Sequence, residues 1–163
     1  MTEREFFVFT IADEAPRFER LLAAVPLAHA NYKPDAKSKT AMELSANMVG
    51  EAGTVIKTIL TTGKIDFSTV SAPSFASPAE AGSAIMQMLQ EVKALAEQTS
   101  EEVWDSEAVA GMGEKMDWKS TRGKMAWSML LDLIHHRGQL STYIRPMGGK
   151  VPSIYGPSAD SGE

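Results

Sequence analysis

Residues 121–145 read TRGKMAWSMLLDLIHHRGQLSTYIR, and this stretch decides the fold class. Its apolar residues recur at the spacing of one helix face. They are Ala126, Met129, Leu130, Leu133, Leu140, Tyr143 and Ile144. Pro146 ends the pattern, because proline pushes the residue before it out of the α region. The stretch therefore predicts one long amphipathic helix.

Three earlier segments show the same helical period. The first covers about residues 3–25 and contains Pro16, which predicts a helix that is kinked or split there. The second, about 40–63, begins with the spacing of a capping box and ends on glycine. The third, 77–98, opens with serine, proline and glutamate in N-cap order. Together with 121–145 they predict an all-α four-helix bundle.

The connections between these helices are long. They cover residues 26–39, 64–76 and 99–120. Loops of this length in a compact bundle are often functional. Strand patterns are weak, and a short hairpin within 103–118 is the one left open. The tail at 151–157 has large apolar residues between prolines, so we expect it to pack on the bundle. The whole chain, 1–163, is expected to form a single domain.

Composition narrows the classes of function. The chain has 163 residues, a formal net charge of −5 and no cysteine, so disulfides and thiolate sites are excluded. An acidic chain without a basic block argues against nucleic-acid binding. No apolar run is long enough to cross a bilayer, and the first residues lack the pattern of a signal peptide. We therefore expect a cytoplasmic protein with no membrane partner.

A cluster of polar residues interrupts the predicted apolar faces. His136 continues the stripe of the last helix, and Asp132 lies four residues earlier on the same face. Asn47 faces inward on the second helix, and Glu51 follows it at the same spacing. If these two helices face each other, the four side chains meet inside the bundle. Bundle cores are where facing helices build metal and cofactor sites.

Two interpretations of this cluster stay open. In the first, the imidazole and the oxygen ligands bind a divalent metal such as Zn²⁺, Ni²⁺ or Mn²⁺, with a position left for water. In the second, Asp132 hydrogen-bonds His136 and fixes its tautomer within a buried network that holds no metal.

The neighbours of His136 are expected to do other work. His135 points about 100° away from it around the helix, so both cannot easily serve one site. Arg137 is expected to brace a carboxylate or the tail rather than to bind a substrate. Gly138 costs about 1 kcal/mol in a helix relative to alanine, which predicts close approach of another segment.

Two segments near the C-terminus resemble a known family. The stretches MLLDLIHHRGQL (129–140) and VPSIYGPSAD (151–160) are similar to the C-terminal signature of the DinB/YfiT-like family. Its members are described as DNA-damage-inducible metalloenzymes. The resemblance extends over essentially the whole chain. It implies a four-helix bundle, often a dimer, and a metal held by three histidines, one on the second helix and two on the last. Some relatives use low-molecular-weight thiols as isomerases or transferases.

Carried over by position, the three ligands of the family fall on Asn47, Asp132 and His136. Only one of them is histidine here. Asparagine offers a weak neutral oxygen, and aspartate is a harder ligand than imidazole. Such a site, with Glu51 nearby, would hold a metal loosely or prefer Mn²⁺ or Mg²⁺ to Zn²⁺.

Three hypotheses of function follow. In the first hypothesis, the chain is a degenerate metal-dependent hydrolase or thiol-transferase-like protein that acts on a small molecule. Alternatively, it is a catalytically inactive stress-response module that binds a small ligand. A third alternative is a structural homodimer, for which Leu131 and Ile134 on the last helix offer an apolar interface.

Overall fold

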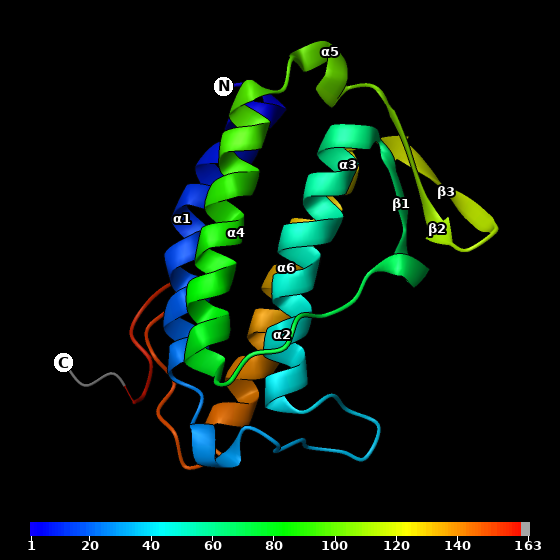
Figure 1. Cartoon of the computed structure of the whole chain (residues 1–163). Coiled ribbons are helices and arrows are strands. Elements are labelled where there is room, and N and C mark those ends of the chain that lie inside the picture. Colours follow the sequence, from blue (N-terminus) through cyan, green and yellow to red (C-terminus); the bar gives the residue numbers. More distant parts are fainter. Residues whose placement is uncertain (161–163) are drawn as a thin grey trace.

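The computed structural model describes residues 1–160, and four long helical segments lie side by side in it (Figure 1). Three are single helices: α1 (Glu3–Ala23), α4 (Pro78–Gln98) and α6 (Arg122–Ile144). The fourth is a continuous run of α2 (Ala41–Gly50), η2 (Glu51–Ile56) and α3 (Lys57–Thr62). Helix α1 packs along α4, and the run from α2 to α3 packs against both α4 and α6. Shorter helical turns are η1 (Leu27–His29), η3 (Phe67–Thr69) and α5 (Glu101–Trp104).

The helix ends follow the local signals. Glu43 N donates to Thr40 Oγ1 at 3.1 Å and Thr40 N donates to Glu43 Oε2 at 2.8 Å, so the predicted capping box is confirmed. Gly63 ends α3 in the left-handed region at φ 69°, which a residue without a side chain adopts freely. Pro16 lies inside α1, which continues through it and is not split. No described helix combines the length and the apolar character that a membrane crossing requires.

The segment η2 is a π-helix, a rare form that is often found at functional sites. It begins at Glu51. Gly50 directly precedes it and Gly53 lies within it, and neighbouring segments approach both glycines closely. A Cβ on Gly50 would lie 3.2 Å from the carbonyl oxygen of Ser71, and one on Gly53 would lie 2.9 Å from Met88 Sδ. The wide turn therefore occurs where α4 and the loop before it press against the helix.

A three-stranded sheet corrects the all-α prediction. Its strands are β1 (Lys64–Asp66), β2 (Glu107–Met112) and β3 (Lys115–Thr121), in that order. The hairpin left open within 103–118 is the antiparallel pair of β2 and β3, while β1 pairs with β2 in parallel. The strand pattern of β2 is weak in the sequence because its buried positions hold the small residues Ala108 and Ala110 rather than β-branched or aromatic ones.

The sheet covers one flank of the helices and positions aromatic side chains beside them. A small apolar cluster joins it to the π-helix, α3 and α6. Its buried members are Val55, Ile59, Ile65, Ala108, Ala110 and Met125. Phe67 and Trp118 pack against this cluster and form a stacked pair, with ring centroids 6.4 Å apart. A larger core fills the space between the helices.

The C-terminal tail returns along α1, as expected for its apolar residues between prolines (Figure 1). Arg17 Nε donates to the carbonyl oxygen of Ile154 at 3.1 Å. Arg20 Nη1 donates to the carbonyl oxygen of Ser153 at 2.9 Å. These bonds attach the tail to the outer side of α1.

The expectation for Gly138 is wrong, because a Cβ built there meets no atom within 4 Å. The glycine stands in open space on α6 and gains nothing from lacking a side chain. Gly138→Ala should therefore raise the free energy of unfolding by about 1 kcal/mol, measured by urea denaturation. A loss of stability in this variant would contradict the open environment.

Gly123 on the same helix has a crowded environment, in contrast to Gly138. A Cβ there would lie 2.1 Å from Nε1 of the buried Trp104, so the indole would have to move. Gly123→Ala is expected to lower the free energy of unfolding by about 1–3 kcal/mol in the same measurement.

Candidate metal site

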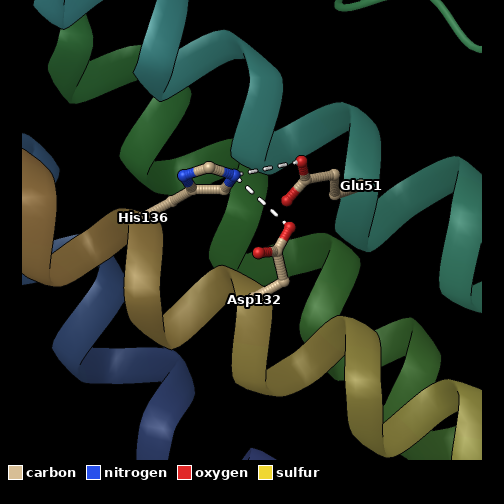
Figure 2. A group of neighbouring side chains, drawn as sticks. All are labelled: Glu51, Asp132 and His136. Atoms are coloured by element: carbon tan, nitrogen blue, oxygen red, sulfur yellow. Dashed lines mark ion pairs between the residues drawn. The ribbon is translucent and has the colours of Figure 1, made fainter.

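His136 lies in the middle of α6 and points toward the π-helix (Figure 2). Its Nε2 is 3.5 Å from Glu51 Oε1 and 3.4 Å from Asp132 Oδ2. Asp132 comes from the preceding turn of α6, whereas Glu51 comes from the facing helical segment. The three side chains thus join two elements that are distant in sequence.

The other ring nitrogen of His136 faces an amide. Nδ1 is 3.3 Å from Gln139 Oε1, and Gln139 Nε2 donates to the Tyr143 hydroxyl at 3.1 Å. Because the amide N–H₂ donates to tyrosine, the amide oxygen faces Nδ1 and accepts a hydrogen bond from the Nδ1–H group. This favours the neutral tautomer in which Nε2 carries the free lone pair, the form that binds a metal.

Glu51 is the least satisfied member of the group. Its side chain is 18% exposed, and Oε1 accepts a hydrogen bond from Asn47 Nδ2 at 2.5 Å. Oε2 is buried and has no hydrogen-bond partner among the described residues. An uncompensated carboxylate oxygen at low exposure is costly, so the site offers an atom that a cation would satisfy.

The structure places the predicted site residues as follows. Asp132 and His136 are together, and Glu51, which the sequence placed nearby, contacts His136 directly. Asn47 lies one turn before Glu51 and hydrogen-bonds it, so its part as a ligand stays a prediction. The ligand positions carried over from the family did not include Glu51 as a direct partner of His136. The available signal was a carboxylate four residues after Asn47, between two glycines.

The spacing of the group fits a small metal ion. Two ligand atoms that are each about 2.1 Å from a tetrahedral ion lie about 3.4 Å from each other. The two distances from His136 Nε2 match this value. One ligand atom from each of Glu51, Asp132 and His136 lies within 4.8 Å of the others. The remaining gap can close because the Asp132 side chain is 46% exposed and free to adjust.

The carboxylates also set the protonation of the histidine. The hydrogen bond to Glu51 raises the pKa of His136 above its ordinary value, against the opposing effect of burial, and the charges of Glu51 and Asp132 raise it further. In the metal-free protein this contact stabilises the folded state fully below the ordinary histidine pKa of about 6.5. That stabilisation is lost as the pH rises through the raised folded value.

Glu51→Gln should therefore lower the pKa of His136 in metal-free protein, because it removes the largest cause of the shift. The measurement is an NMR titration of the His136 ring protons. An unaltered His136 titration would mean that Glu51 does not contact the ring in solution.

A pocket of about 530 Å³ opens beside the group. Asn47, Glu51 and Asp132 are among the residues that line it. Phe67 and Trp118, the stacked aromatic pair, also line it. The lining thus combines polar side chains with aromatic surface, as small-molecule sites commonly do.

The other residues of the histidine motif lie away from the pocket. His135 is exposed on α6. Arg137 is buried and forms an ion pair with Glu14 and a hydrogen bond to Tyr155 of the tail. The prediction that Arg137 braces a carboxylate or the tail is confirmed, and it contacts both.

Comparison with known proteins agrees with this architecture. A sequence model of the DinB family matches residues 6–163. No significant match to a curated protein was found. The chain is similar to a DinB-like protein of known crystal structure, YjoA from Bacillus subtilis, with a TM-score of 0.67. The two are 20% identical over 96% of this chain and 99% of the other. At that identity the likeness concerns the fold alone.

Proposed function

The chain belongs to the DinB family, and from this premise we propose that it binds a divalent metal through Glu51, Asp132 and His136 and acts on a small molecule in the adjoining pocket. The observation that carries the proposal is the meeting of three ligand atoms from facing helices within 4.8 Å of one another, two of them on residues, Glu51 and Asp132, that line an open pocket. The buried, unpartnered oxygen of Glu51 supports it.

Each residue of the candidate metal site has a distinct role in this proposal. His136 supplies a nitrogen ligand, oriented from behind by Gln139. Glu51 and Asp132 supply oxygen ligands, and Asn47 holds the Glu51 carboxylate by donating to it. One nitrogen with two carboxylates is a harder donor set than three imidazoles, which favours Mn²⁺ over Zn²⁺ or Ni²⁺ relative to the three-histidine pattern.

A divalent metal bound there would polarise a carbonyl or phosphoryl oxygen of the substrate, so hydrolysis or group transfer, including transfer to a thiol, is the reaction class. The chain contributes the pocket in which the substrate lies. Trp118 and Phe67 offer a flat apolar wall that orients a carbon skeleton and excludes water from it.

A homodimer is part of the same proposal. Leu131 on α6 is 58% exposed, so one of the two apolar residues expected at an interface is accessible on the outside of the helices. Sedimentation at micromolar concentration should then detect a dimer, and a monomer alone would contradict it.

The metal proposal is tested with protein purified without an immobilised-nickel column. Elemental analysis should find a divalent metal, and chelator-treated protein should gain thermal stability on addition of Mn²⁺, Zn²⁺ or Ni²⁺. A ligand at a hundred times its dissociation constant stabilises by about 2.7 kcal/mol. If none of the three ions changes the thermal stability of the metal-free protein, the result would favour the alternative. In that alternative, an inactive module uses the same hydrogen-bonded network to bind a small ligand without metal.

A further inference from the structure

A second pocket, of about 540 Å³, lies on the other side of Asn47. Its walls come from three segments: residues 33–39 before α2, the first turns of α2, and residues 72–75 before α4. Asn47 lines this pocket and also the pocket beside the candidate metal ligands. The two hollows are therefore neighbours that share one wall residue.

Three lysines gather at the second pocket although the chain as a whole is acidic. Lys33, Lys37 and Lys39 all line it and are exposed, in a protein with a formal net charge of −5. Within residues 1–160 none of the three makes an ion pair, whereas Lys57 and Lys93 are each paired with a glutamate. Lys33 Nζ donates one hydrogen bond to the carbonyl oxygen of Ala36 at 3.0 Å, which leaves its charge unneutralised, so all three ammonium charges are available to a ligand.

The acidic residue among the lining residues, Glu43, is already hydrogen-bonded within the chain. Glu43 lines the pocket, but its carboxylate accepts the backbone N–H of Thr40 in the capping box. It neutralises one of the three lysine charges at most, so the lining keeps an excess of positive charge.

The start of α2 does not itself offer a binding site for an anion. The N–H groups of Ala41 and Met42 donate to the carbonyl oxygens of Tyr32 and Ala30, both at 2.9 Å. The N–H of Glu43 donates to Thr40 Oγ1. With the first-turn donors occupied, recognition of a negative group in this pocket falls to the lysines.

The remaining lining suits a short carbon skeleton. Met42, Ala46 and Phe75 contribute apolar surface to the lining that also holds the lysines and Asn47. A ligand that lies along them places its charged end in the second pocket. Because Asn47 lines both pockets, the other end of such a ligand can extend toward Glu51 in the neighbouring one.

We propose that Lys33, Lys37 and Lys39 bind the carboxylate or phosphate group of a small anionic substrate whose reactive end lies at the candidate metal site. The identity of the substrate end that reacts rests on the proposed function, whereas the anion pocket stands on its own charges and lining. Opposite charges in the approach path also raise the rate at which an anion reaches the pocket, and salt screens this effect.

The experiment uses chelator-treated, full-length protein at low ionic strength, with succinate and inorganic phosphate as separate probes followed by NMR. Saturable shifts of the backbone amides of residues 33–47 are expected with at least one probe. The triple variant Lys33→Gln, Lys37→Gln, Lys39→Gln should weaken that binding about tenfold or more. Which probe binds more tightly identifies the carboxylate or the phosphate as the recognised group.

A matched control separates the pocket from general charge. Lys64→Gln, Lys119→Gln, Lys150→Gln removes the same charge from exposed positions outside the pocket lining and should leave the affinity within about twofold. Equal weakening in both triple variants, or no saturable binding to the unmodified chain, would overturn the proposal.

His136→Ala distinguishes the two proposals from each other. Anion binding should persist in this variant, because the imidazole does not line the second pocket. If the unmodified chain binds metal but no anion, the lysine pocket is refuted and the metal proposal stands. If it binds the anion but no metal, the reverse holds.

Discussion

Arg137→Met is expected to lower the free energy of unfolding by about 3–5 kcal/mol. Arg137 is 3% exposed and pairs with Glu14, which is 4% exposed, so both charges are inside the protein. Removing the guanidinium leaves the buried Glu14 carboxylate with one cationic partner instead of two, since Arg17 Nη1 still lies 3.1 Å from Glu14 Oε1. The cost arises mainly from this under-compensated buried charge rather than from the lost attraction, and urea denaturation of the metal-free protein measures it.

The other contacts of Arg137 add to the cost, because Arg17 replaces none of them. Its guanidinium carbon lies 4.5 Å from the centre of the Phe18 ring on α1, and Nη2 donates to the Tyr155 hydroxyl of the tail. Tyr155 in turn donates to Glu14 Oε2 at 3.1 Å. One side chain of α6 therefore holds α1 and the tail together, and its loss should loosen the tail as well.

Two further variants make the prediction sharp. Arg145→Met breaks a more exposed ion pair with Asp160 and should cost no more than about 1 kcal/mol. The double variant Glu14→Leu, Arg137→Met removes both buried charges, so it should be more stable than Arg137→Met alone. If Arg137→Met and Arg145→Met cost the same, the buried pair does not stabilise the fold as inferred.

The role of Arg137 could be predicted from the sequence because it follows from helix geometry alone. An arginine one residue beyond an inward histidine faces a different neighbour, about 100° around the helix. The helix limits were equally predictable, since Thr40, Ser77 and Thr121 carry the capping signals and cap the helices in the structure. These features depend on residues only a few positions apart.

The features that could not be predicted depend on contacts between distant segments. Strand β1 has three residues and pairs with residues 109–111, more than forty positions away. No local pattern specifies that pairing. The contact of Glu51 with His136 likewise depends on how the π-helix, pressed by Met88 and the loop at Ser71, turns toward α6. A regular helical wheel places Asn47 and Glu51 on one face but does not say which of them reaches the histidine.

His136→Ala is expected to weaken metal binding about a hundredfold or more, because it removes the nitrogen ligand and leaves two carboxylates facing each other. His135→Ala, one residue away and exposed, is the matched control and should leave the affinity within about twofold. Competition against a chromophoric chelator, with Mn²⁺ and Zn²⁺ in turn, measures both. Equal losses in the two variants would show that the binding is not at this site.

The same measurement decides between Glu51 and Asn47 as the second ligand. If Glu51 is the ligand, Glu51→Gln should cost about as much as His136→Ala. Asn47→Ala should then cost only about tenfold, because Asn47 acts by holding the Glu51 carboxylate. The reverse order of losses would instead assign the ligand to Asn47, the position that the family resemblance implies. The relative size of these two losses therefore tests whether the π-helix has moved the metal ligand by one turn, from Asn47 to Glu51.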